Sequence, residues 1–381
     1  MSSLRETIRS LFTPVRPLPP GSYHYQAPPA DERSYRLHLR LEADGQGILI
    51  VNASTILHLN PTAAEYAFYL VQNLPEDQVA KNMAARYRVP QEKALQDYRD
   101  FKDRIDTLIS TPDLDPVTFL DFERQEPFSG EISAPYRLDC ALTYRLPEGA
   151  APAAAPTDRV TRELTTDEWK TVLDKAWNAG IPHVIFTGGE PTLREDLADL
   201  IVHAEKNNQV TGLMTDGLRL AGPEYLDSLL QSGLDHLTLI LRPEIETSWT
   251  ALQQMLAADL FVAVHLTLNE HNQEQLASLL ERLAGMGVHA VSLSASSLSL
   301  ADQLDDLRGQ AASLNLDLVW NLPVPYSALN PVALETDGME EPEGAGKAWL
   351  YVEPDGDVLP AQGIQRRMGN LLTDPWEQIW S

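Results

Sequence analysis

The sequence predicts an α/β protein in which a small β3α3 unit precedes a larger unit of alternating strands and helices. Apolar and polar residues alternate over 35–59, as in half-buried strands, and helical periodicity then continues to residue 110. Beyond residue 136, short apolar runs alternate with helical stretches, which is typical of a parallel sheet or barrel. Charge divides the chain too: residues 131–381 hold 15 basic and 37 acidic side chains, against 14 and 18 before them.

The first 33 residues are expected to form a disordered, proline-rich lead-in. Six prolines fall in this stretch, and such a composition favours an extended chain over a packed element. The prolines are Pro14, Pro17, Pro19, Pro20, Pro28 and Pro29.

Residues 34–110 are expected to be the first folded unit. The alternation over 35–59 predicts a three-strand meander, with turn signals between the strands. Asn60 followed by Pro61 is a typical helix start, because asparagine caps the free N–H groups and proline suits the first turn. The helical stretches lie at about 63–73, 76–87 and 90–109.

Residues 111–135 are expected to be a connector, because prolines interrupt its short apolar patches. The alternating pattern then covers 136–325. Residues 335–346 are acidic and glycine-rich, as in a solvated linker, and the tail 347–381 contains one hairpin pattern with Pro354-Asp355-Gly356 as its turn.

Composition excludes several classes of function. A net charge of −26 opposes attraction to a phosphate backbone, so we do not expect nucleic acid as a partner. No stretch approaches the ~18–20 apolar residues of a membrane span, and the amino end lacks a signal-peptide core, so we expect a cytoplasmic protein without a membrane partner. Cys140 is the only cysteine, which excludes an intramolecular disulfide and any site that needs several thiolates from one chain.

The nine histidines predict no metal site. None has HxH or HExxH spacing, and we expect most of them, such as His183 and His236 at strand starts, to make ordinary hydrogen bonds.

The strongest candidate site is the run Gly188, Gly189, Glu190 and Pro191. It follows an apolar strand and precedes a helix, so it lies at the strand edge where βα proteins bind ligands. The glycines allow close approach to the backbone, and the Glu190 carboxylate could accept from an ammonium group. A tight turn with a solvated glutamate explains the same residues equally well.

The surroundings of this motif resemble the radical S-adenosylmethionine (SAM) enzymes. The resemblance covers about 135–325 and is densest over 181–220. It implies a partial TIM-type (β/α)6 barrel over 136–325, in which the GGEP run contacts the methionine part of SAM. Glu190 would then bind the SAM amine, and Asp216, in the sequence LMTDG, would be a further candidate contact.

The flanking segments resemble domains found in peptide-modifying members of this family. The tail 347–381 is similar to the SPASM extension, and 34–110 is similar to the winged-helix-like PqqD domain. The resemblance implies that a precursor's leader peptide binds the front unit, where an exposed sheet edge beside a helix could accept it by strand addition. A purely structural cap is the alternative.

The sequence departs from the family where iron is bound. The family's CxxxCxxC loop holds a 4Fe-4S cluster, but Leu146, Ala150 and Ala153 occupy those positions here, and none has a donor atom. Ala361 replaces the cysteine expected in the tail. A 4Fe-4S cluster is therefore not expected. Arg242 stands where a ribose-contacting polar side chain is usual, which argues against an ordinary nucleoside pocket.

Three functions remain open. The first is a catalytically silent homologue that binds a leader peptide, or supports an active radical SAM maturase. The second is an enzyme that binds SAM at the 188–191 run and uses it without radical chemistry. The third, a working radical SAM peptide-modifying enzyme, follows from overall similarity but is opposed by the ligand count.

Overall fold

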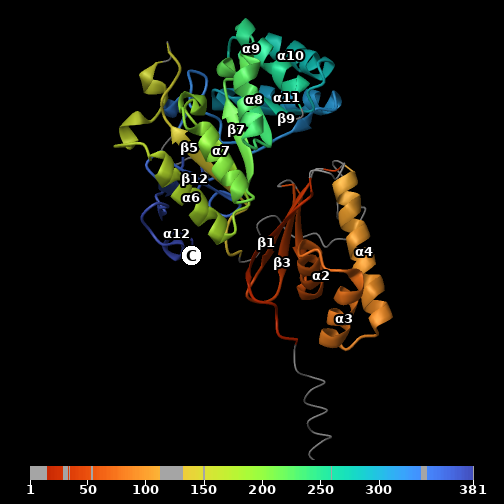
Figure 1. The fold of residues 1–381 in the computed structure, drawn as a ribbon. Helices are drawn as coiled ribbons and strands as arrows, with labels where there is room; N and C mark the ends of the chain where they lie inside the picture. Colours follow the sequence, from red (N-terminus) through yellow and green to blue (C-terminus); the bar gives the residue numbers. More distant parts are fainter. Residues whose placement is uncertain are drawn as a thin grey trace, which may run out of the picture. The chain divides into compact units, whose positions relative to one another are not determined.

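The chain forms two compact units, one ending at Ile132 and the other beginning at Ser133 (Figure 1). The structure is a computed structural model. It describes residues 15–28, 33, 35–52, 55–111, 132–148, 151–258, 260–335 and 341–380.

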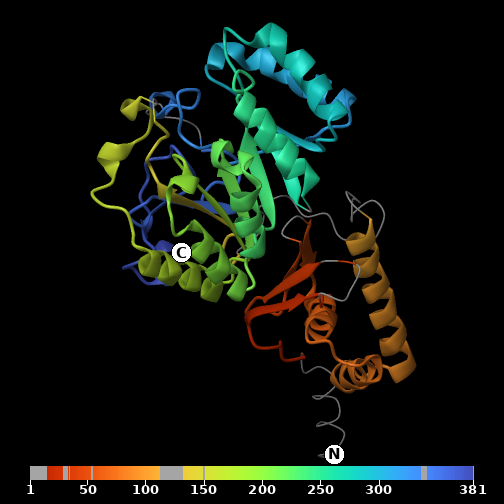
Figure 2. The same cartoon turned by 45° about the horizontal axis from the view of Figure 1, so that its top comes forward.

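The described part of the first unit contains one four-stranded antiparallel sheet and three helices. The strands follow each other in the order β1 (Gly21–Gln26), β2 (Arg36–Leu41), β3 (Gly47–Val51) and β4 (Thr55–Leu59). The helices are α2 (Pro61–Val71), α3 (Glu76–Tyr87) and α4 (Gln91–Ser110), and they lie on one face of the sheet (Figures 1 and 2). The predicted meander and helices are confirmed to within a few residues.

Side-chain periodicity explains this unit. Leu39, Leu49 and Leu57 point from successive strands into one core, where Tyr98 and Ile105 of α4 meet them. Asn60 caps α2 as predicted, because its side-chain oxygen accepts a hydrogen bond from the backbone N–H of Ala63 at 3.0 Å.

The expectation of an unpacked lead-in is wrong for Gly21–Gln26. This segment is β1, which pairs antiparallel with β2. The ring of Tyr23 meets the ring of Phe68 edge-on, with the ring centres 4.9 Å apart. Backbone pairing and aromatic packing together outweigh the cost of ordering the chain. The remaining parts of this lead-in at 1–14 and 29–32, and most of the predicted connector, lie outside the described residues.

The second unit is built on a ten-stranded sheet within the described residues. Six adjacent strands are parallel and in chain order: β5 (Arg137–Thr143), β6 (His183–Gly188), β7 (Val210–Thr215), β8 (His236–Ile240), β9 (Phe261–Leu268) and β10 (Ala290–Ala295). The short parallel strand β11 (Asp317–Leu318) borders β10. The predicted alternation is confirmed by α6 (Thr166–Ala179), α7 (Leu197–Lys206), α8 (Pro223–Gln231), α9 (Glu246–Ala257), α10 (Gln273–Gly285) and α11 (Ala301–Ser313).

The tail adds strands to the other edge of this sheet. Strand β12 (Trp349–Val352) pairs in parallel with β5, and β13 (Asp357–Leu359) returns antiparallel beside it, which confirms the predicted hairpin. The short strand β14 (Gly369–Asn370) and helix α12 (Trp376–Ile379) follow.

The two faces of the parallel sheet have different roles. Val184, Phe186 and Leu213 pack in one core with the apolar residues of the helices. Ile185 and Met214 alternate with them and point to the opposite face, which we call the inner face.

Candidate functional site

The two glycines of the GGEP run are required by the packing of the chain on itself. Gly188 ends β6 with φ +127°, and a Cβ there would lie 2.2 Å from the carbonyl oxygen of Thr143. A Cβ on Gly189 would lie 2.3 Å from the carbonyl oxygen of Arg145. The backbone N–H groups of Gly189 and Glu190 donate to these same two oxygens, at 2.7 and 2.9 Å. The turn is therefore tied to the end of β5.

Glu190 is buried and joins this turn to the end of β7. Its Oε1 accepts hydrogen bonds from the N–H and hydroxyl of Thr192, at 2.9 and 2.5 Å, and from the Thr215 hydroxyl at 2.8 Å. Its Oε2 accepts from the backbone N–H of Asp216 at 2.9 Å. Burial, and then the neighbouring Asp216 carboxylate, raise the pKa of Glu190 to about 7. The predicted solvated glutamate is thus wrong, because four local donors hold the side chain inside.

Asp216 lies beside Glu190, so the structure brings the predicted pair together. Its Oδ1 accepts from the backbone N–H of Leu218 at 3.0 Å. Its Oδ2 is buried and has no hydrogen-bond partner among the described residues. A buried carboxylate oxygen without a donor is costly, so an ammonium group of a ligand fits this position. Arg242 follows the end of β8, where its backbone N–H donates to the Ser248 hydroxyl.

The predicted cluster loop is packed rather than open. Leu146 contacts an aromatic cluster that includes Tyr144, Tyr326 and Tyr351. Ala153 lies in the short 3-10 helix Pro152–Ala154, and Ala150 lies outside the described residues. The described part of the loop therefore offers no thiolate.

Cys140 cannot substitute for the missing ligands. Its side chain is fully buried in the core that faces the helices, between Leu138 and Leu142 of the same strand. Burial, and then Asp139, raise the pKa of the thiol well above its usual value, which disfavours the thiolate. The described residues also contain no group of three or more His, Cys, Asp or Glu side chains that could hold a metal ion. These residues do not fit a 4Fe-4S cluster.

A buried network of tyrosine, glutamate and arginine lies beside the loop, and sequence reasoning missed it. The Tyr144 hydroxyl donates to Glu353 Oε1 at 2.9 Å, and its ring meets the Tyr326 ring edge-on at 5.4 Å. Tyr326 and Arg159 both donate to Glu335. Burial is the main cause that raises the pKa of Glu353 to about 7. The members come from separate segments, so no local motif could have revealed them.

His183 and His236 meet across β7. Their Nε2 atoms are 2.7 Å apart, and Gly212 leaves the space, because a Cβ there would lie 2.1 Å from the His236 ring. Burial, and then Arg137, lower the pKa of His236 to about 4, so the ring is neutral at physiological pH. The expected ordinary hydrogen bonding is confirmed for this pair.

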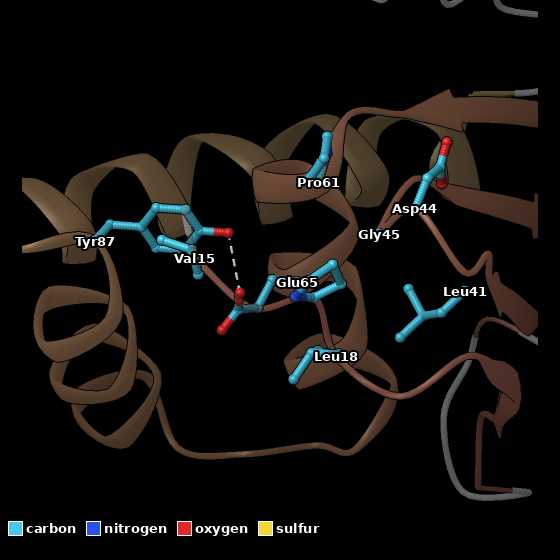
Figure 3. A pocket seen from close by; sticks show the side chains of 9 residues that line it. Val15, Leu18, Leu41, Asp44, Gly45, Pro61, Glu65 and Tyr87 are labelled. Atoms are coloured by element: carbon cyan, nitrogen blue, oxygen red, sulfur yellow. Dashed lines mark hydrogen bonds between the residues drawn. The ribbon is translucent and has the colours of Figure 1, made fainter. Parts of the chain in front are cut away.

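The first unit contains a cavity of about 120 Å³ lined by a buried carboxylate (Figure 3). Glu65 accepts hydrogen bonds from the hydroxyls of Tyr69 and Tyr87, each at 3.0 Å, and forms an ion pair with Arg86. Its charge is therefore already compensated. The cavity walls are otherwise mainly apolar, and they are formed by Val15, Pro17, Leu18, Leu41, Asp44, Gly45, Pro61 and Tyr87.

Among the described helices, none is long and apolar enough to cross a membrane.

Comparison with known proteins places the second unit. Residues 140–242 match the family model of the radical SAM superfamily. PqqA peptide cyclase of Streptomyces rochei is 26% identical over 282 residues, which make up 65% of this chain and 76% of that protein.

Solved structures share the fold at low sequence identity. SuiB of Streptococcus suis, bound to its precursor peptide SuiA, aligns with a TM-score of 0.56 and 15% identity over 90% of this chain and 87% of SuiB. SuiB bound to S-adenosylmethionine aligns with a TM-score of 0.55 and 14% identity over 94% and 88%. The chain therefore carries a radical SAM domain at 140–242, and it is similar to peptide-modifying relatives of that superfamily.

Proposed function

We propose that this chain is a catalytically silent radical SAM homologue that binds a precursor peptide and presents it to, or supports, an active maturation enzyme. The observation that carries the proposal is the cluster loop. Leu146 stands at a ligand position and packs against Tyr144 and Tyr326, while the only thiol lies in the core on the helix side. Three thiolates cannot be assembled from these residues.

The peptide is expected at the amino-terminal unit, which we take as PqqD-like. Strand β4 pairs with β3 and, among the described residues, with no second strand. An open strand edge can accept an extended peptide through main-chain hydrogen bonds. Ile56 of this strand is 37% exposed and could contact the peptide's side chains. That a relative is named a peptide cyclase, and that SuiB was solved with a precursor peptide, supports a peptide partner.

Co-purification tests this proposal. The full chain, carrying an affinity tag, is recovered from its native host, and bound peptides and proteins are identified by mass spectrometry. We expect a precursor peptide or a maturation enzyme, with the recovered peptide reduced at least about tenfold by Ile56→Asp. Phe261→Asp is the matched control, because Phe261 is also exposed but lies in the second unit. Capture of neither partner would reject the proposal.

A second candidate, SAM binding without iron, is favoured by the buried Asp216 Oδ2 that lacks a donor. Glu190 and Asp216 would hold the SAM ammonium, and the bound SAM would supply an electrophilic alkyl group. Calorimetric titration with SAM, with iron assayed in the same sample, tests this reading against Glu190→Gln. Binding that the substitution abolishes, without iron, supports it; no affinity in the millimolar range rejects it.

A working radical SAM enzyme is what the superfamily match alone would suggest. Anaerobic reconstitution followed by iron and sulfide analysis decides this reading. Stoichiometric iron and sulfide would establish it and overturn the silent homologue.

A further inference from the structure

A proline-containing segment after β11 lies extended on the inner face of the parallel sheet. It runs over 321–326 with the sequence Asn-Leu-Pro-Val-Pro-Tyr. Arg137, the first residue of β5, donates from Nη2 to the carbonyl oxygen of Asn321 at 2.6 Å. Tyr326 donates its N–H to the carbonyl oxygen of Gly188, the last residue of β6, at 2.8 Å. The segment therefore runs along the strands towards the GGEP turn.

Side chains of the sheet and the tail hold the segment through its carbonyl groups. The buried Thr187 hydroxyl donates to the carbonyl oxygen of Pro323 at 2.6 Å. The side-chain amides of Asn330 and Gln362 both donate to the carbonyl oxygen of Val324, at 2.7 and 2.8 Å. Main-chain recognition of this kind is independent of the side chains of the bound segment.

Two alternate side chains of the segment give it specificity. Leu322 and Val324 pack against an apolar patch of the inner face, formed by Ile185, Met214 and Ile240. Spacing of two residues is the period of an extended chain, in which such side chains point the same way. Pro323 and Pro325 have no N–H and restrict the backbone, so the segment loses little freedom when it binds.

We propose that the inner face of β5 to β8 is a binding site for an extended peptide with apolar side chains two residues apart, occupied here by the chain's own segment 321–326. Four donor groups and an apolar patch form the site, and all of them engage one short stretch of chain. A peptide supplied from outside must displace this segment. The site belongs to the second unit and is separate from the strand edge proposed for the leader peptide.

Displacement by charge tests the site in the full chain. Leu322→Asp combined with Val324→Asp places two carboxylates against the apolar patch, which should free it. The probe is a fluorescein-labelled peptide of the sequence Asn-Leu-Pro-Val-Pro-Tyr, followed by fluorescence anisotropy. We expect the double variant to bind this peptide at least about tenfold more tightly than wild type, because the competing segment is removed. Ala328→Asp, an exposed change just beyond the segment, should behave like wild type.

Two results of this titration would overturn the proposal. One is a double variant that binds the peptide no better than wild type. The other is equal binding of a control peptide with aspartate at both apolar positions. The probe has the chain's own sequence, so neither result depends on whether the amino-terminal unit captures a precursor.

A milder variant decides the matter if the double variant fails to fold. Thr187→Val keeps the side-chain shape but removes the hydrogen bond to Pro323. We expect the backbone amides of Val324 and Tyr326 to exchange with deuterium about five to ten times faster than in wild type. Unchanged exchange at both amides would show that the proposed contacts do not hold the segment, and would reject the proposal.

Discussion

The GGEP turn and the cluster loop follow neighbouring strands, β6 and β5, yet they differ in what their side chains do. At the turn, Glu190 and Asp216 are held together with one carboxylate oxygen lacking a donor. At the loop, Leu146 completes an aromatic cluster. The turn is tied to β5 by backbone packing that involves no ligand, so it persists for structural reasons even where metal ligands are missing. A GGEP motif alone is therefore weak evidence for radical chemistry.

The largest expected effect comes from filling the close backbone contact at the turn. Gly188→Ala should destabilise the chain by at least about 3 kcal/mol, because the new methyl group meets the Thr143 carbonyl and the φ is unfavourable for alanine. Chemical denaturation measures the change. Gly309→Ala is the control: Gly309 lies inside α11 with open space around it, so alanine should stabilise by about 0.5–1 kcal/mol. Similar losses for both variants would contradict this account.

Next in size is the pH dependence of stability. The pKa of Glu190 and that of Glu353 are each raised from the ordinary 4.5 to about 7. Between these values the folded chain retains a proton that the unfolded chain has lost, so stability falls as pH rises from about 4.5 to 7. Each group should contribute a fall of at most about 3 kcal/mol.

Glutamine variants separate the two regions. Glu190→Gln and Glu353→Gln should each remove one share of the fall, measured as the difference from wild type in urea unfolding between pH 4.5 and 7.5. A wild-type difference that stays constant with pH for one variant would show that its carboxyl titrates normally.

A smaller effect is expected from the hydrogen bonding of the aromatic cluster. Tyr144→Phe leaves the buried Glu353 without its hydroxyl donor and should cost about 1–2 kcal/mol. Tyr225→Phe, at a half-buried tyrosine of α8, should change stability by less than about 0.5 kcal/mol. Equal effects in thermal or urea unfolding would show that the network contributes no specific stability.

The smallest effect is expected at the thiol. Cys140→Ala should cost about 1 kcal/mol as a lost core contact, and the iron bound after anaerobic reconstitution should not change. Iron analysis of both proteins in parallel measures this. A loss of bound iron in the variant would mean that the thiol is a ligand, and the two regions would then have to be reinterpreted together.

Local patterns predicted most of the elements but fewer of the contacts. The alternation over 35–59 predicted β2 to β4, and the apolar runs predicted the parallel strands, because period and turn residues are local properties. Strand β1 was missed because proline content outweighed a short alternation around Tyr23 and Tyr25. The candidates Glu190 and Asp216 were predicted, but the hydrogen bonds that hold them inside were not.

The sequence by itself determined the order of strands and helices, the position of the GGEP turn after a strand, and the absence of enough thiols for an iron–sulfur cluster. These follow from periodicity, turn chemistry and a count of one cysteine. Only the tertiary structure decided that Cys140 faces the helices, that Tyr144 and Glu353 share a buried network, and that 321–326 covers the inner face. Those contacts join residues far apart in the chain, and their energies depend on burial and geometry that arise only when the sheet has closed around them.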